Sequence, residues 1–110
     1  ENVLECSKVV KSGFFRPPYG VIRKSQSKQI KERGFKIIMW DVLSWDFSQK
    51  CSPEKCLDNV INNVESGSII VFHDNLKARK NLTYALPETL KFLKDNAFIC
   101  RSLNDVQNAD

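Results

Sequence analysis

The chain has 110 residues, of which 42% are hydrophobic and 27% are charged. This size and balance are typical of one globular domain and argue against a disordered chain. The net charge is +4, but the lysines and arginines form no long run, so a solvated surface is a better interpretation than a nucleic-acid interface. No apolar stretch approaches the roughly 20 residues that a membrane-spanning helix needs.

The first predicted elements are a short strand at 13–15 and a polar helix at 24–33. Between them, RPPYG at 16–20 predicts a stiff turn, because proline cannot donate to a strand ladder and disrupts a helix interior. Gly34 is placed to end the helix. The apolar run FKIIMWDV at 35–42 predicts a strand that is buried on both faces.

The next elements are a helix and a strand. Ser52 suits the N-cap position and Pro53 the first helical position, and an apolar stripe at helical spacing continues toward Gly67. The helix is therefore expected to end at that glycine. SIIVFHD at 68–74 predicts a second buried strand.

The last predicted elements are a helix at 83–96 and a strand at 97–103. Pro87 would be tolerated in that helix only within its first turn. The alternation of strands and helices predicts parallel strands joined by right-handed crossovers, which is an α/β fold. One domain at 1–103 is expected, followed by a C-terminal tail at 104–110.

The cysteines are even in number, so disulfides are formally possible. The Cys51–Cys56 spacing is looser than the C-x-x-C of a usual zinc or redox pair. Cys56 and Cys100 fall in apolar patterns, where free thiols are common. Structural thiols are therefore the first interpretation for Cys6, Cys51, Cys56 and Cys100, a disulfide is the second and a metal site the third.

Ionisable side chains follow three consecutive predicted strands: Arg16 and Tyr19 the first, Asp46 the second, and His73 the third. Because the carboxyl ends of parallel strands meet at one edge, we expect these groups to lie close together. A histidine paired with a carboxylate can deliver a proton to a leaving group. Arg16 could orient a carboxylate, and a backbone N–H of the turn at 18–20 could face an oxyanion. A lone histidine after an apolar run is more often structural.

At these residues the sequence resembles the polysaccharide deacetylases, which form carbohydrate esterase family 4 and share the NodB-homology domain. RPPYG at 16–20 is similar to their third motif, WDVLSWDF at 40–47 to the fourth and IIVFHD at 69–74 to the fifth. NLTYALPETLKFLKDNAF at 81–98 is similar to their closing helix. The resemblance covers about 3–103. It implies a parallel-stranded partial (β/α) barrel, the C-terminal portion of a distorted (β/α)7 barrel.

The resemblance implies that the complete enzyme hydrolyses the amide C–N bond of an N-acetylated carbohydrate. Arg16 would orient the aspartate that serves as catalytic base. Asp46 would tune the acid–base groups, and His73 would protonate the leaving amine.

The resemblance also implies residues that bind the substrate. The turn at Pro18 and Tyr19 would bind the acetyl oxyanion through its backbone. Val71, where the family often has leucine, would contact the acetyl methyl group. Phe47 stands where the family usually has tryptophan, so one wall of the groove would differ. Apart from the resemblance, the aromatic side chains of Trp45 and Phe47 could stack on sugar rings, as in a binding module.

The family's base and metal ligands come from motifs that precede RPPYG. The chain contains one histidine, so the family's His-x-x-x-His pair of metal ligands cannot be present in it. The complete enzyme is expected to use a divalent metal, zinc, whereas no metal is expected to bind this chain, which alone would be inactive. It would then be the C-terminal fragment of a metal-dependent enzyme whose substrate is an N-acetylated polysaccharide or oligosaccharide.

An open piece of a barrel leaves a strand edge and an apolar face uncovered, so a homo-oligomer or a complementing N-terminal half is expected. The family's substrates place the parent enzyme in the cell envelope or outside the cell. Two alternatives stay open. One is a non-catalytic carbohydrate-binding module, and the other is an unrelated α/β domain whose motif matches arose by chance.

Overall fold

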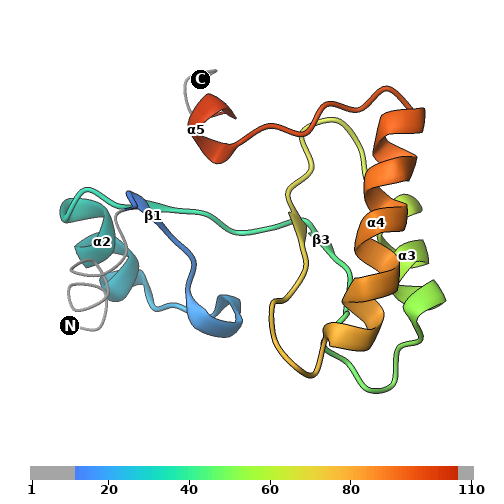
Figure 1. Cartoon of the computed structure of the whole chain (residues 1–110). Helices are drawn as coiled ribbons and strands as arrows, with labels where there is room; N and C mark the ends of the chain where they lie inside the picture. Colours follow the sequence, from blue (N-terminus) through green and yellow to red (C-terminus); the bar gives the residue numbers. More distant parts are fainter. Residues whose placement is uncertain (1–11, 107–110) are drawn as a thin grey trace. The chain divides into compact units, whose positions relative to one another are not determined.

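The computed structural model describes residues 12–106, and the side chains of 12–104. The chain divides into two compact units, Glu1–Met39 and Trp40–Asp110. The described elements of the first unit are β1 (Phe14–Phe15), a 3-10 turn η1 (Pro18–Gly20), α2 (Lys24–Glu32) and β2 (Lys36–Ile37). Those of the second unit are β3 (Val42–Leu43), α3 (Pro53–Ile61), β4 (Ile70–Val71), α4 (Arg79–Asp95) and α5 (Leu103–Val106) (Figure 1).

In the first unit, β1 and β2 pair in parallel, with Phe14 opposite Lys36. The crossover between them contains α2, which confirms the helix predicted there. Ile30 is the buried residue of α2. Gly34 follows the helix with φ of +90°, a left-handed conformation that side chains disfavour, so the glycine predicted to end the helix does so.

The second unit repeats this arrangement and adds the 17-residue helix α4. β3 and β4 pair in parallel, with Val42 opposite Ile70, and α3 forms the crossover. α3 and α4 pack side by side (Figure 1). The apolar core lies between the strands and these helices and includes Val42, Cys56, Val60, Ala78, Ala85 and Leu93. Parallel strands with helical crossovers confirm the predicted α/β class.

The strands are much shorter than predicted. The apolar run at 35–42 yields β2 and β3 as separate two-residue strands in different units, and the run at 68–74 yields β4 alone. Each described sheet has two strands. A strand in such a sheet has a hydrogen-bonding partner on only one of its edges, and so small a sheet is only marginally stable. The hydrophobic runs identified where strands occur but overestimated their extent.

α3 begins as predicted and ends earlier than predicted. Ser52 caps it, since its Oγ accepts a hydrogen bond from the Lys55 amide at 3.1 Å. The helix ends at Ile61 instead of continuing to Gly67. Asn63 explains the early end, because its Nδ2 donates to the Asn59 carbonyl at 2.8 Å, in competition with the helical backbone.

α4 begins four residues before the predicted start, so Pro87 lies in the helix interior and not in its first turn. The Asn75 side chain favours the earlier start, since its Oδ1 accepts a hydrogen bond from the Ala78 amide at 2.9 Å. Proline has no N–H to donate to the carbonyl four residues earlier, which belongs to Thr83. The helix therefore continues without this bond, because its buried face packs against α3.

The strand predicted at 97–103 is wrong. Within the described part of the chain, no strand follows α4. The chain instead reverses at Ala97, which has φ of +64°, and the Phe98 amide donates to the Leu93 carbonyl at 2.8 Å. α5 then occupies part of the predicted tail. Among the described residues, no helix combines the length and the apolar character needed to cross a bilayer.

Replacing Ser52 tests the cap of α3. Ser52→Ala is expected to lower the free energy of unfolding by about 1 kcal/mol, because the Lys55 amide loses its acceptor. Urea unfolding followed by circular dichroism measures the change. Ser66→Ala, at an exposed turn residue, is the matched control and should change stability by less than about 0.5 kcal/mol. Equal effects of the two substitutions would contradict the capping role.

Candidate functional site

The central feature of the second unit is a bidentate pair between Asp46 and His73. Asp46 Oδ1 lies 2.8 Å from His73 Nδ1, and Asp46 Oδ2 accepts a hydrogen bond from the His73 backbone amide at 2.7 Å. The Asp46 side chain is buried, whereas the His73 side chain is 33% exposed. Because both carboxylate oxygens contact the same residue, the imidazole orientation is fixed, and its Nε2 is the ring nitrogen that can face a substrate.

The parallel pair of strands brings these residues together. Asp46 follows β3 and His73 follows β4, and Leu43 lies opposite Val71 in the ladder. Each side chain therefore emerges shortly beyond the carboxyl end of its strand. The Ser44 Oγ accepts a hydrogen bond from the Asp46 amide at 3.3 Å and so tightens the turn that leads to the carboxylate.

Aromatic rings adjoin the pair. The Phe47 ring meets the His73 ring edge-on with centroids 4.8 Å apart, and the Trp45 ring lies 5.3 Å from Phe47. Trp45 is 48% exposed and has φ of +65°, a strained conformation for a large side chain. An exposed indole next to this carboxylate–imidazole pair can stack on the face of a ring-shaped ligand. Val71, on β4, is half-buried.

Two asparagines that the sequence analysis did not identify hold the loop around Asp46. The Asn81 side chain, which is buried, donates from Nδ2 to the carbonyls of Asp46 at 3.0 Å and of Cys51 at 3.1 Å, with Ser48 at 3.4 Å. Asn59 Nδ2 donates to the Ser44 carbonyl at 3.0 Å. Asn81 shares the buried face of α4 with Ala85, Thr89 and Leu93. A polar residue on a core-facing stripe is the signal that could have identified it.

The remaining predicted site residues belong to the first unit. Arg16 donates from Nε to the Ile38 carbonyl at 3.1 Å and from Nη2 to the Met39 carbonyl at 3.3 Å. Tyr19 is almost wholly exposed and has φ of +57°, and Pro18 is exposed as well. The predicted meeting of Arg16 with the Asp46–His73 pair stays a prediction.

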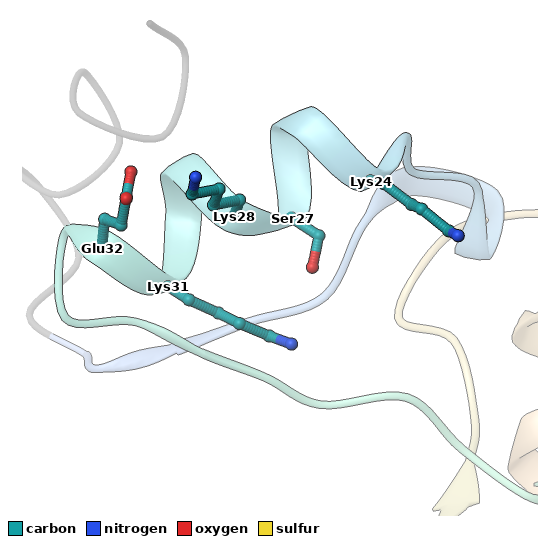
Figure 2. Close-up of a pocket in the computed structure, with 5 residues that line it drawn as sticks. All are labelled: Lys24, Ser27, Lys28, Lys31 and Glu32. Carbon is teal, nitrogen blue, oxygen red and sulfur yellow. The ribbon is translucent and has the colours of Figure 1, made fainter.

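A charged hollow lies on one face of α2. It measures about 580 Å³ and is lined by Lys24, Ser27, Lys28, Lys31 and Glu32, whose side chains project from successive turns (Figure 2). None of the predicted site residues lines it. We interpret it as a solvated cationic helix face.

A metal site cannot be assembled from the described residues alone. Within 12–104, no group of three or more histidine, cysteine, aspartate or glutamate side chains is arranged to hold an ion. By themselves, residues 12–104 therefore do not fit the metal that the resemblance implies.

The thiol of Cys56 is buried on α3, the helix that follows the Asp46 loop. Its burial, together with the charge and hydrogen bonding of Cys51 and the charge of Asp46, raises the pKa of Cys56 from 9.0 to about 11. Cys56 is therefore a neutral thiol near neutral pH.

Comparison with known proteins identifies several deacetylases among the relatives of the chain, although no family model matches it. The chain is 33% identical over 89 residues to a peptidoglycan-N-acetylglucosamine deacetylase of Bacillus cereus, which corresponds to 77% of this chain and 40% of that protein. It also superposes with a TM-score of 0.81 and 28% identity on a solved peptidoglycan N-acetylglucosamine deacetylase, covering 96% of this chain and 49% of that one. The chain thus spans less than half the length of either of these two proteins.

A second similar structure is a family 4 carbohydrate esterase pseudoenzyme of Bacillus anthracis. The two chains are 26% identical with a TM-score of 0.68, and the match covers 77% of this chain and 28% of that one. A mutant of that pseudoenzyme has restored enzymatic activity. The relatives of this chain therefore include both deacetylases and a pseudoenzyme.

Asn81→Ala is expected to loosen the loop at 44–51, because the carbonyls of Asp46 and Cys51 would lose the hydrogen bonds that the Asn81 amide donates. The expected loss of stability is about 2–3 kcal/mol. Hydrogen exchange should be faster in this loop than in wild type. Asn63→Ala, at an exposed asparagine with a single helix carbonyl as partner, is the control. Unchanged exchange in Asn81→Ala would contradict the positioning role.

The raised pKa of Cys56 predicts a pH dependence of stability. Because the folded-state pKa lies above the unfolded value, the neutral thiol's contribution is present below pH 9.0 and is lost as pH rises through about 11. Each pKa unit corresponds to about 1.4 kcal/mol. In urea unfolding under reducing conditions, wild type should lose more stability than Cys56→Ala across this interval. Parallel losses in the two proteins would show that Cys56 is not responsible.

Proposed function

We propose that this chain, which is related to the polysaccharide deacetylases of carbohydrate esterase family 4 and matches their C-terminal portion, supplies the proton-donating half of a carbohydrate deacetylase site. The substrate would be an N-acetylated polysaccharide or oligosaccharide, and the reaction would hydrolyse its amide C–N bond. The observation that carries the proposal is the bidentate Asp46–His73 pair at the ends of two adjacent parallel strands.

The pair suits the protonation of a leaving amine. An amide C–N bond breaks readily only if the nitrogen receives a proton, and His73 Nε2 is the donor in this proposal. Asp46 accepts the hydrogen bond from Nδ1, so the second ring nitrogen is directed away from the carboxylate. An imidazolium at this position would have its charge opposed by a buried carboxylate at 2.8 Å.

Neighbouring residues would shape the substrate groove. Val71 is proposed to contact the acetyl methyl group, and Phe47 to form the wall beside His73, where its ring already packs. Trp45 is proposed to stack on a sugar ring. From the first unit, Arg16 is proposed to orient the base, and the turn at Pro18 and Tyr19 to bind the oxyanion.

The other half of the site must come from outside these residues. The chain contains one histidine, and the described residues do not gather a metal-binding cluster. We propose that a complementing N-terminal segment supplies the base and the ligands of a divalent metal, zinc, and that residues 1–110 alone do not turn over substrate. Self-association of the chain is the alternative way to cover its exposed apolar residues.

A second candidate function is carbohydrate binding without catalysis. The exposed Trp45 indole, in a strained backbone conformation beside Phe47, favours it, because such strain is retained at ligand sites. The similarity to a pseudoenzyme supports the same reading.

Acetate release separates the two functions. Residues 1–110 with Zn²⁺ and an N-acetyl-chito-oligosaccharide are expected to release no acetate. Addition of the N-terminal half of a related peptidoglycan deacetylase should produce release, and His73→Ala should lower the rate about 10²–10⁴-fold, the usual contribution of a general acid. Asp74→Ala, at the exposed neighbouring residue, is the control and should retain the rate.

Sugar titration completes the test. Saturable quenching of Trp45 fluorescence by the oligosaccharide, lost in Trp45→Ala and accompanied by no acetate release after complementation, would favour the binding module. Acetate release by residues 1–110 alone that survives His73→Ala would overturn the assignment of His73 as the acid.

A further inference from the structure

Two cysteines occupy paired positions at the start of α3. Cys51 directly precedes the N-cap Ser52, and Cys56 is the fourth residue of the helix. The Ser52 carbonyl accepts a hydrogen bond from the Cys56 amide at 3.0 Å, which closes the first turn. Side chains at these two positions commonly pack together as a hydrophobic staple that fixes how the chain enters the helix. In this chain both members of the staple are thiols.

A separate contact places the Cys51 sulfur over the same helix face. Cys51 Sγ lies 4.0 Å from Asn59 Nδ2, and Asn59 is three residues beyond Cys56, on the same side of α3. Cys51 is also among the groups that raise the pKa of the Cys56 thiol, as expected of a nearby side chain. The Cys51 and Cys56 side chains therefore lie on the same side of α3 at its start.

We propose that Cys51 and Cys56 form an oxidisable dithiol that a low-molecular-weight disulfide converts into an intramolecular disulfide. Cys51 is partly exposed, whereas Cys56 is buried, so Cys51 reacts first. Its thiolate attacks the small disulfide and releases one thiol, leaving a mixed disulfide. Cys56 then loses its proton, attacks the Cys51 sulfur and expels the second thiol. Two protein thiols and one disulfide thus become one protein disulfide and two small thiols.

The position of this dithiol gives its oxidation a structural consequence. The Cys51 carbonyl and the Asp46 carbonyl accept hydrogen bonds from the same Asn81 amide. A Cys51–Cys56 bond would add a covalent cross-link between the end of the Asp46 loop and the first turn of α3. Oxidation is therefore expected to restrict the loop that carries the carboxylate partner of His73, whatever reaction that pair performs.

Peptide mapping tests the proposal directly. Trypsin cleaves after Lys50, Lys55 and Lys77, so Cys51 and Cys56 separate into peptides 51–55 and 56–77. Folded protein is incubated with oxidised glutathione, free thiols are blocked with iodoacetamide, and the digest is analysed by mass spectrometry. A linked pair of 51–55 and 56–77, lighter by two hydrogen atoms than the two reduced peptides and reversed by dithiothreitol, is expected.

Single variants test the order of the steps. Cys56→Ser should retain glutathione on Cys51, because the resolving thiol is absent. Cys51→Ser should leave Cys56 unmodified in the folded protein and modified in urea. Cys100→Ser, which removes an exposed thiol, should leave the 51–56 linkage unchanged. A dominant linkage of Cys51 to Cys6 or Cys100, or rapid glutathionylation of Cys56 in folded Cys51→Ser, would overturn the proposal.

Thermal unfolding gives an independent measurement. If the disulfide fits the native turn, the oxidised protein should unfold about 5–10 °C above the reduced protein. The difference should disappear on reduction and in Cys56→Ser. An oxidised form that unfolds below the reduced form would show that the bond strains the turn, and would overturn the proposal that the native geometry is ready for closure.

Discussion

Burial of the Asp46 carboxylate is the constraint on which the second unit depends. An ionised carboxylate without exposure to water is costly unless its oxygens are hydrogen-bonded. Both carboxylate oxygens are hydrogen-bonded to His73: Oδ1 to the ring nitrogen Nδ1 and Oδ2 to the backbone amide. Since Asp46 follows β3 and His73 follows β4, the two strands must pair in their observed register for the carboxylate to be satisfied. The same contact that stabilises the strand ends also orients the imidazole.

The loop between β3 and α3 depends on side-chain amides instead of a strand ladder. Buried carbonyls need hydrogen-bond partners, and Asn81 and Asn59 supply them from two different helices. These bonds fix the loop around Asp46 from the side of α3 and α4. A loop held in this way can accommodate the left-handed conformation of Trp45. The packing of α3 on α4 therefore supports both the position of the carboxylate and the exposure of the indole.

In an α/β fold, the residues of one site can come from several strands. Each strand delivers its own residues to the carboxyl edge, so acid and base groups can come from different β/α units. Asp46 and His73 follow two neighbouring strands, β3 and β4, and are hydrogen-bonded to each other. The relatives of the chain include deacetylases and a pseudoenzyme, so the pair by itself is compatible with turnover in a completed site or with binding alone.

The sequence alone determined features that depend on neighbouring residues or on the alternation of strands and helices along the chain. The α/β class followed from the order of apolar runs and helical stripes, and the Ser52-Pro53 start of α3 from capping chemistry. The proximity of Asp46 and His73 followed from the rule that the carboxyl ends of parallel strands share an edge. Each inference uses only a periodicity or a turn, and the structure confirms the element or contact that it names.

Only the tertiary structure decided how far the strands and helices extend and which hydrogen bonds hold them in place. β2, β3 and β4 are two residues long because strand length depends on backbone partners that a hydrophobic run does not reveal. The early end of α3, the early start of α4 and the absence of the predicted strand at 97–103 each depend on side-chain or turn hydrogen bonds. Asn81 joins residues more than thirty positions away, and an interaction across that separation has no periodic signature in the sequence.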